Sequence, residues 1–381
     1  MLTVKPHKLN EATPMLYKPD LDDIIPRMEA WWRGALLDRV CIAVTAPNGK
    51  PLREVTPPAT PFEQRSDPDY LFDSAEASME ATYFAGDAIP VFQPDLGADT
   101  FSACLGAPLE YTEHTTWAKQ IITDWEDPPS FEIDPDSFAW KWNHEMYRMA
   151  AERARGKYFV AALDCHSGGD ALLAMRGGSS LCLDLYDHPK AVKAAMSSLE
   201  AAVVQFHEAF WPLIEATGQR GHTTAWLNTW SPGRSNVIQL DLLAVISPRQ
   251  FAEFFRRELE VQMEVLDNTV YHLDGPDAIP HLPALHDLFG HTPDRSSDAQ
   301  RDTVIPIQWV PGAGALPMVR WIPLLKDMQA AGANLHLWCE PEEIEPLATG
   351  LSSRGLYLST SASSKEEADG LVKLAAKLTH E

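Results

Sequence analysis

The sequence predicts an α/β fold in the form of a single (β/α)8 (TIM) barrel. Eight short, apolar, β-prone runs recur along the 381 residues, and a helical pattern follows most of them. Alternating strand and helix patterns are typical of a parallel α/β architecture, and eight repeats in a chain of this length favour the barrel. The alternative is an open doubly wound sheet. No GxGxxG motif follows the first run, which removes the commonest reason to prefer that sheet.

Several of the predicted strands are nearly continuous in apolar residues, as expected for parallel strands that are buried on both faces. They cover residues 40–46, 89–94, 158–164, 223–230, 269–274, 304–310, 334–340 and 355–360. The predicted helices cover residues 67–84, 139–155, 184–216, 247–267, 317–331, 341–349 and 364–378. Helix boundaries carry the usual signals. Ser247 is a good N-cap that is followed by Pro248, and Gly332 is a natural C-terminal cap.

No linker, charge block or internal repeat divides the chain. We therefore expect an N-terminal arm and helix over residues 1–38 and a single barrel domain over residues 39–381. The long segments that follow the first two strands are expected to form loops and small helices.

The charge and the cysteines exclude several classes of protein. There are 31 basic and 54 acidic residues, which gives a net charge of −23. This charge disfavours binding to nucleic acid or to an anionic membrane. No apolar stretch has the length of a membrane span. Five cysteines without a CxxC pair indicate free thiols, and the expected location is the cytoplasm.

A barrel carries its active site at the carboxyl ends of the strands. His272 and Asp274 are the most specific candidates there, because residues two apart on a strand point to the same face. An imidazole and a carboxylate on one face can share a metal ion, or the carboxylate can orient the imidazole for acid/base catalysis. The alternative is a hydrogen-bonded histidine beside a turn-forming Asp-Gly pair.

Other predicted strand ends supply further candidates. Cys339 or Glu340 could add a metal ligand, although adjacent residues face opposite ways and at most one should face the barrel axis. Asn228 and Gln308 could orient polar groups of a ligand. Tryptophans could form apolar walls for a flat ligand, or they could serve ordinary packing; they are Trp226, Trp230, Trp309 and Trp338. The run Asp164-Cys165-His166 favours a turn at a strand end over a nucleophile and its base.

With these residues identified, the chain resembles the uroporphyrinogen decarboxylase superfamily. The resemblance covers about residues 25–378 and is strongest in SGGDALLAMRGGSSLCLDLYDHP (167–189), in DLLAVISPRQFAEFFRRELE (241–260) and from YHLDG to the end. It is closest to a branch whose members carry YHLDGP and IQWVPG segments. The superfamily also holds corrinoid (cobalamin)-dependent methyltransferases, and the resemblance implies a barrel of the uroporphyrinogen decarboxylase type.

In the thiol-alkylating methyltransferases of this superfamily, zinc is bound by an HxC motif on the fifth strand and by a cysteine on the last. Here His272 matches the histidine, Asp274 replaces the first cysteine, and residues 358–363 contain none. Oxygen ligands could still hold zinc or another divalent metal. The resemblance therefore implies a metal site at His272 and Asp274, with Glu340 or Cys339 as a further ligand.

The decarboxylases of the superfamily need no metal and bind a tetrapyrrole with many carboxylates through an arginine-rich N-terminal segment. Residues 38–54 lack that signature, and Asp95 is only a loose counterpart of the family's substrate-binding aspartate. A decarboxylase would need another cationic clamp, with Arg176, Arg234 and Arg320 as candidates. The alternative role of Arg176 is an ion pair with an acid such as Asp184.

Three functions stay open at this stage. The leading one is methyl transfer linked to a corrinoid, with a small molecule or a corrinoid protein as substrate. The alternatives are a metal-free decarboxylase of a porphyrin-like or smaller carboxylate, and a non-catalytic protein that binds a corrinoid or tetrapyrrole. The DxHxxG motif of a cobalamin-carrying domain is absent, so a corrinoid would be supplied by a partner or bind as a free cofactor. A homodimer is one option for the oligomeric state.

Overall fold

The main sheet is largely parallel and belongs to a mixed α/β fold. The computed structural model describes residues 14–292, 303–312 and 314–380, and within them this sheet has seven strands in the order β2–β1–β13–β12–β11–β10–β9. All neighbours pair in parallel except β2, which is antiparallel to β1. The strands are β1 (Cys41–Pro47), β2 (Thr82–Gly86), β9 (Ser235–Gln239), β10 (Asn268–Asp274), β11 (Pro306–Val310), β12 (Asn334–Trp338) and β13 (Leu356–Ser361).

Three small two-stranded sheets accompany the main sheet in the described part of the chain. One is parallel and two are antiparallel. They pair β3 (Val91–Phe92) with β6 (Phe159–Val160), β4 (Leu109–Tyr111) with β5 (Thr116–Ala118), and β7 (His222–Thr223) with β8 (Trp230–Ser231).

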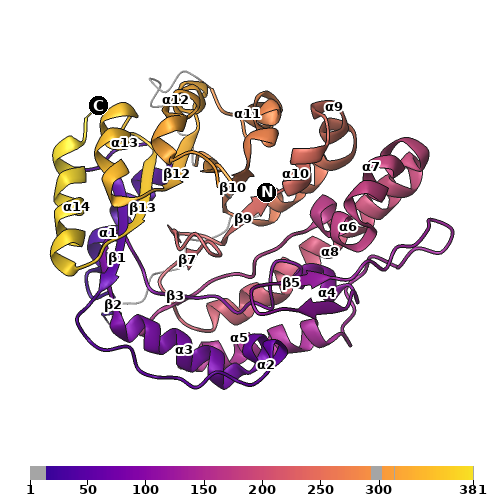
Figure 1. Cartoon of the computed structure of the whole chain (residues 1–381), viewed down its shortest axis with the longest axis horizontal. Helices are drawn as coiled ribbons and strands as arrows, with labels where there is room; N and C mark the ends of the chain where they lie inside the picture. Colours follow the sequence, from indigo (N-terminus) through magenta and orange to yellow (C-terminus); the bar gives the residue numbers. More distant parts are fainter. Residues whose placement is uncertain (1–13, 293–302, 313, 381) are drawn as a thin grey trace, which may run out of the picture.

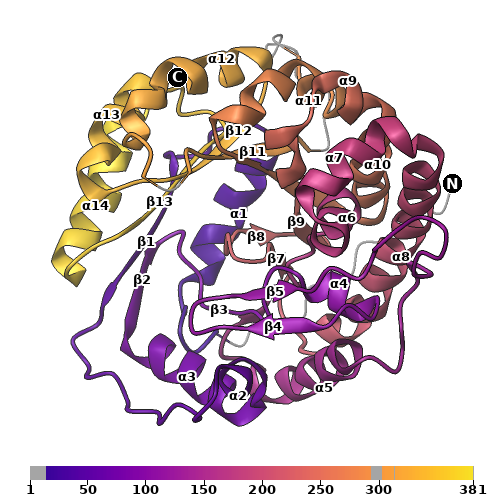
Figure 2. The ribbon, with the colours of Figure 1, turned by 45° about the vertical axis from the view of Figure 1, so that its right-hand side comes forward.

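Most helices lie outside the strands and surround them, whereas α1 lies among the strands (Figures 1 and 2). The α-helices are α1 (Leu21–Trp32), α2 (Pro61–Ser66), α3 (Pro68–Ala81), α4 (Thr100–Cys104), α5 (Phe138–Arg153), α6 (Gly168–Arg176), α7 (Gly178–Asp187), α8 (Pro189–Glu215), α9 (Pro248–Gln250), α10 (Arg256–Val265), α11 (Leu282–Leu288), α12 (Ile322–Ala331), α13 (Ile344–Gly350) and α14 (Lys365–Leu378). Single turns of 3₁₀ helix are η1 (Asp241–Val245), η3 (Pro276–His281), η4 (Met318–Trp321) and η5 (Pro341–Glu343), and η2 (Phe251–Phe255) is a π-helical turn.

The strands are buried on both faces, and alternate residues belong to two different hydrophobic clusters. On β10, Val270 belongs to an inner cluster that contains α1, and Tyr271 and Leu273 belong to the outer cluster beneath the surrounding helices. His272 and Asp274 have the parity of Val270, so they share its inner face.

Helix α1 is tied to the inner side of the strands by hydrogen bonds from both of its tryptophans. The Trp32 indole N–H donates to the carbonyl of Trp230 (2.8 Å), and the Trp31 indole N–H donates to that of Gly355 (3.1 Å). Asn334 in turn donates to the carbonyl of Trp31 (2.6 Å). These bonds join the helix expected within residues 1–38 to the strands of the expected 39–381 domain. Residues 1–13 of the predicted arm lie outside the described residues.

The prediction of a strand over residues 223–230 is wrong. This run is a turn between β7 and β8, and the parallel partner of β10 is instead β9. Ala225 and Leu227 are buried in the inner cluster without joining a sheet, so the apolar run reflects burial rather than strand geometry. Asn228 has a φ of 53°, a left-handed conformation that asparagine tolerates and an extended strand cannot contain.

Two predicted helices also differ from the structure. The helix predicted over 67–84 ends at Ala81, because the β-prone residues from Thr82 onward form β2 against β1. The helix predicted over 184–216 is interrupted at His188, where φ is −129°, and α8 begins at Pro189. Proline cannot continue the preceding helix but suits the first turn of a new one.

No helix in the described part of the chain is long and apolar enough to cross a membrane.

The buried side chain of His336 on β12 should make the free energy of unfolding depend on pH, which tests the packing of the inner side of the strands. Its ring is fully buried, stacks on Tyr357 (4.6 Å between centroids), and burial lowers its pKa to about 3. The unfolded chain binds a proton near pH 6.5 that the folded chain does not, so the stability that the neutral ring contributes is lost as pH falls below 6.5. We expect the stability difference between wild type and His336→Leu to fall by about 2 kcal/mol from pH 6.5 to pH 5, measured by urea unfolding. A difference that stays constant with pH would contradict this expectation.

Candidate active site

The candidate active site lies where β9 and β10 end, and three potential metal ligands meet there. His272 and Asp274 come from β10, and Asp241 follows β9 at the start of η1. One ligand atom of each residue lies within 4.8 Å of the others. All three side chains are partly exposed, so an ion could reach them. The arrangement offers one imidazole nitrogen and two carboxylates, a donor set typical of divalent metals in proteins.

Asp170, in the first turn of α6, fixes the position of Asp241. Its two carboxylate oxygens accept the backbone N–H groups of Asp241 and Leu242, both at 2.9 Å. These N–H groups begin η1, so the carboxylate acts as a cap supplied from a different helix. The helix α6 thereby determines where the chain turns after β9.

A second group of potential ligands shares Asp241 with the first. His166, Asp170 and Asp241 also bring one ligand atom each within 4.8 Å of the others. In the residues that the structure describes, these two are the groups with at least three such ligands. His166 lies 3.8 Å from a carboxylate oxygen of Asp164, so another acid borders the second group.

The carboxyl groups of Asp164, Asp170 and Asp241 lie close together, and burial raises the pKa of each of them. Burial raises the pKa of Asp241 to about 6, and repulsion by Asp170 adds to this effect. Burial, opposed by His166, raises the pKa of Asp164 to about 7. Burial by itself would lower the pKa of His166, but attraction to Asp164 and Asp170 outweighs it and the pKa is raised. Acids in such surroundings are stabilised by a cation, and a divalent ion would supply that charge.

Gln308, the register partner of His272 on β11, orients the imidazole. Its side-chain carbonyl oxygen lies 2.6 Å from His272 Nδ1 and can only accept a hydrogen bond. Nδ1 therefore carries the proton, which leaves Nε2 as the nitrogen with a free lone pair. Trp226 packs edge-on against the same ring, with 5.6 Å between centroids.

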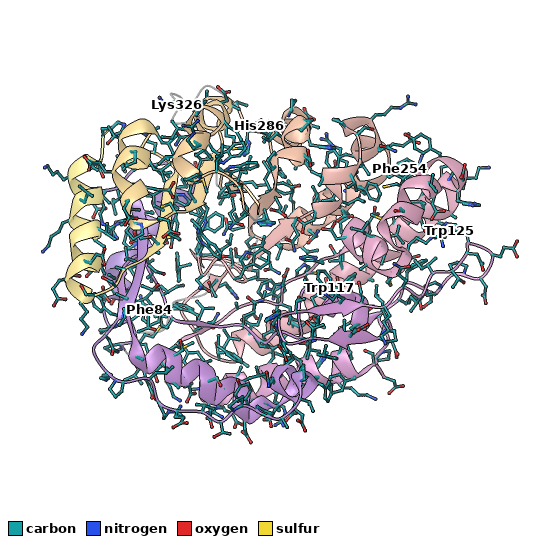
Figure 3. The ribbon with its side chains drawn as sticks, viewed as in Figure 1. Phe84, Trp117, Trp125, Phe254, His286 and Lys326 are labelled. Atoms are coloured by element: carbon teal, nitrogen blue, oxygen red, sulfur yellow. The ribbon has the colours of Figure 1, made fainter. Side chains whose placement is uncertain are left out.

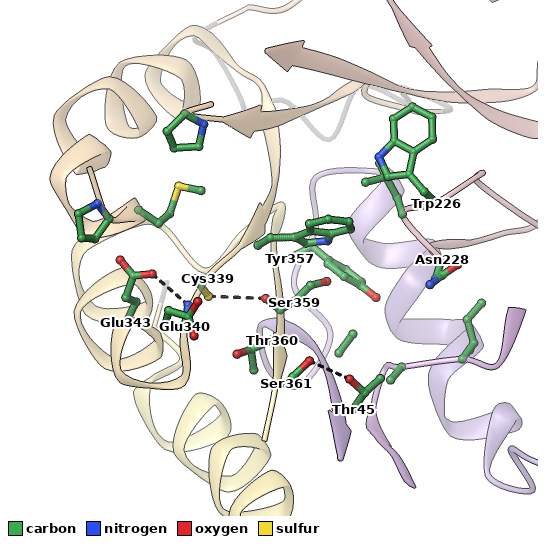
Figure 4. Close-up of a pocket in the computed structure, with 18 of the residues that line it drawn as sticks. Thr45, Trp226, Asn228, Cys339, Glu340, Glu343, Tyr357, Ser359, Thr360 and Ser361 are labelled. Carbon is green, nitrogen blue, oxygen red and sulfur yellow. Dashed lines mark hydrogen bonds between the residues drawn. The ribbon is translucent and has the colours of Figure 1, made fainter. Parts of the chain in front are cut away.

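A cavity of about 670 Å³ is lined by Trp226 but not by Asp241, His272 or Asp274 (Figure 4). Trp226 connects the cavity to these three residues, because it also contacts His272. Trp226 and Asn228 lie on one side of the cavity, Glu340 and Glu343 lie on the other, and Tyr357 lies between them. Volumes of this size are typical of sites for small molecules.

Cys339 and Glu340 line this cavity but are not part of either ligand group among the described residues. The Cys339 thiol points to the carbonyl of Ser359 at 3.8 Å, and burial raises its pKa far above the ordinary value, which keeps the thiol protonated. Glu340 precedes η5 as its N-cap. The structure therefore does not bring these two residues together with His272 and Asp274.

Two of the tryptophans expected at the site lie elsewhere. Trp230 is buried in the inner cluster, and its indole N–H donates to the carbonyl of Arg220 at 2.7 Å. Trp309 is fully buried in the outer cluster and packs against Trp321. Its neighbour Gln308 faces the other side of β11, as alternation along a strand requires.

None of the three arginines considered as a clamp lines the cavity. Arg176 forms an ion pair with Asp184 (2.6 Å) and lies over the ring of Trp125, which Figure 3 labels. Arg234 pairs with Glu215 at 3.0 Å. Arg320 is exposed on η4. Within the residues that the structure describes, the cavity therefore lacks the cationic clamp that a ligand with many carboxylates would need.

Asp241, His166 and Asp170 were not identified as potential ligands from the sequence. The strand before Asp241 was predicted at residues 223–230, so Asp241 was not recognised as a residue at the end of a strand. The signal is the short run Ser235–Gln239, which begins two residues after a Pro-Gly pair and ends two residues before Asp241. His166 was considered only as a base for its neighbour Cys165.

Comparisons with known proteins support the fold alone. No family model matches the chain, and no curated protein matches it. Among solved structures, the chain is similar to a methyltransferase from Methanosarcina mazei, with a TM-score of 0.56 and 12% sequence identity. The alignment covers 95% of this chain and 99% of that protein. The chain thus has a distant, near full-length structural similarity to an archaeal methyltransferase.

Gly168 tests how α6 is held beside the site. Its φ is +51°, and an added Cβ would overlap the carboxyl group of Glu258, which accepts the Gly169 N–H at 2.5 Å. We expect Gly168→Ala to lower the free energy of unfolding by about 2–4 kcal/mol, from the left-handed backbone and the clash together. The measurement is urea unfolding.

Gly156 is a matched control, because its φ is also positive (+71°) but no atom lies within 4 Å of an added Cβ. We expect Gly156→Ala to lower the stability by only about 1–2 kcal/mol, the backbone cost alone. Equal losses in the two variants would show that the contact with Glu258 does not constrain α6.

Proposed function

We propose that this protein is a metal-dependent methyltransferase that acts on a small molecule bound in the cavity. The observation that carries the proposal is the convergence of Asp241, His272 and Asp274 within 4.8 Å. The cavity is linked to them through Trp226, which contacts His272 and lines the cavity. The structural similarity to an archaeal methyltransferase supports the fold on which the proposal rests.

The residues present fit a divalent ion. The donors are one nitrogen and two oxygens, and the buried Oδ1 of Asp241 has no hydrogen-bond partner in the described residues. These donors suit zinc or another divalent metal. They differ from the soft, cysteine-rich ligand set of a zinc that activates a thiolate. When bound, such an ion supplies Lewis acidity, which lowers the pKa of the group that it coordinates.

The side chains of the chain itself would position the reactants. Gln308 holds the imidazole of His272 in one orientation and, by accepting the hydrogen bond from Nδ1, leaves Nε2 as the nitrogen that can bind a metal. Trp226 contacts His272 and also lines the cavity, so it gives the metal ligands and the cavity a shared apolar neighbour. An apolar side chain of this kind excludes water and so strengthens the electrostatic interactions within the site.

We propose a corrinoid carried by a partner protein as the other reactant in the methyl transfer. A cavity of about 670 Å³ suits one small molecule, so a macrocycle on a carrier would be presented at the mouth. Trp338 lines the cavity and is 49% exposed, which would give such a carrier an aromatic contact. Nothing in the lining favours the decarboxylase, because it contains two glutamates and no lysine or arginine in the described residues.

We also propose that the strands form a distorted (β/α)8 barrel of the uroporphyrinogen decarboxylase type. The parallel pairing of β1 with β13 joins the first strand to the last, as barrel closure requires. The parallel pair β3–β6 would supply the second and third strands, and β9 to β13 the remaining ones. The helices around the strands in Figure 2 and the buried inner cluster support this arrangement.

Metal content tests the proposed function directly. We expect about one divalent ion per chain in the purified protein, measured by plasma mass spectrometry, because three ligands converge on one point. The ion should be lost in His272→Ala and Asp274→Asn, and methyl transfer should be lost with it. The exposed Asp277, three residues from Asp274, provides the control Asp277→Asn, which should retain the ion.

Three results would count against this assignment. An ion lost in His166→Ala but retained in Asp274→Asn would place it in the second ligand group. No ion in the wild type would remove the metal-dependent mechanism. A bound ion with tight ligand binding and no turnover would favour the non-catalytic binding protein.

Gln308 provides a separate test as a positioning residue that binds no metal itself. Loss of the acceptor for His272 Nδ1–H should weaken metal affinity by about 10- to 100-fold in Gln308→Leu, as found for similar partners of metal-bound histidines. The matched control is Gln239→Leu on the other neighbour of His272, since Gln239 bonds Asp164 instead. Competition with a metal-binding dye measures both affinities, and equal losses would refute the positioning role of Gln308.

A further inference from the structure

The cavity combines aromatic walls with acidic residues. Trp226 and Trp338 line it and come from two separate segments of the chain, and Tyr357 also lines it, although one face of its ring stacks on His336. The faces of such rings carry partial negative charge and attract cations. Aromatic side chains on several sides of a small cavity are the usual way in which proteins bind alkylated ammonium groups.

The charged residues of the lining are acids. Glu340 and Glu343 lie opposite Trp226 (Figure 4), and the described lining residues include no lysine, arginine or histidine. Both oxygens of Glu343 already accept backbone N–H groups, from Val319 (3.0 Å) and Glu340 (3.0 Å). Glu343 is therefore held in place as a negative charge. The Glu340 carboxylate is exposed and accepts the backbone N–H of Glu343 in the same reciprocal capping box.

The cavity lining also contains an unpartnered hydroxyl group. Thr360 Oγ1 is buried and has no hydrogen-bond partner in the described part of the chain, whereas the Tyr357 hydroxyl interacts with the side chain of Ser359. Buried polar atoms are normally paired, so Thr360 Oγ1 indicates a group that a ligand or water satisfies. A ligand with a polar substituent beside its cationic group would use it.

We infer that the cavity binds a small organic cation, a tertiary or quaternary ammonium compound, as the small-molecule ligand. The indole rings of Trp226 and Trp338 would contact the alkyl groups, Glu340 and Glu343 would balance the charge, and Thr360 Oγ1 would bind a polar substituent. This inference rests on the proposed function only in taking the cavity as the substrate site. It names the chemical class of that substrate, which the ligand group around His272 does not.

Choline and its neutral isostere 3,3-dimethyl-1-butanol provide the test, because they differ in the charge of one central atom. Binding is measured by calorimetry in metal-free protein at a fixed ionic strength of about 0.15 M, where long-range charge effects are screened. We expect choline to bind at least tenfold more tightly than the isostere. Equal affinity for the two compounds, or binding of neither, would overturn the inference.

Variants at the cavity make the test specific. Glu340→Gln and Trp338→Leu should each weaken choline binding at least threefold, and Glu340→Gln should leave binding of the isostere unchanged. Glu342→Gln is the matched control, since Glu342 is an exposed neighbouring acid that does not line the cavity. If Glu342→Gln weakens choline binding as much as Glu340→Gln does, the effect comes from the overall negative charge and the inference fails.

The metal-free protein keeps this result separate from the proposed function. Choline binding in a protein that takes up no divalent ion would support the cation site and refute the metal-dependent mechanism. Metal binding together with equal affinity for choline and the isostere would refute the cation site and leave the metal-dependent mechanism in place.

Discussion

The candidate site depends on the two hydrogen bonds that the Asp170 carboxylate accepts from the backbone of Asp241 and Leu242. They begin η1 directly after β9 and bring the Asp241 side chain beside His272 and Asp274. Asp170 is itself held by the start of α6, where the Glu258 carboxyl group accepts the Gly169 N–H. Gly168 leaves the space for that carboxyl group. The ligand group is thus positioned by the packing of α6 and α10, not by the sheet alone.

A row of polar side chains crosses the inner side of the sheet at the level of His272. The strand register aligns Gln239, His272, Gln308, His336 and Tyr357 on β9 to β13. The inner cluster, which contains both tryptophans of α1, packs on the same side of the strands. Buried polar residues such as Asn268 and Asn334 also lie there, so polar groups on this side are not confined to the row. His336, buried and without a hydrogen-bond partner in the described chain, shows that polar character in this row does not by itself indicate function.

The sequence was sufficient for those features that depend on local periodicity. The parallel strands β10 to β13 and the shared face of His272 and Asp274 follow from apolar runs and from the two-residue repeat of a strand. The turn at residues 223–230 was not predictable in this way, because burial of Ala225 and Leu227 produces an apolar run without a strand. Asp241 and Asp170 were missed for a related reason. Their proximity depends on contacts between α6 and the chain after β9, which lie 71 residues apart.

The segment whose secondary structure was predicted wrongly is also the one that connects the two parts of the site. Trp226 lies in the turn between β7 and β8, contacts His272 and lines the cavity. An extended strand over residues 223–230 would have alternated its side chains between the two faces, whereas the turn allows Asn228 to adopt a left-handed backbone and to lie beside Trp226 at the cavity. The departure from regular strand geometry therefore gives the ligand group and the cavity a common wall. A substrate in the cavity would lie against the same indole that packs on the imidazole of His272. A substitution of Trp226 should therefore affect both substrate binding and the arrangement of the metal-binding side chains.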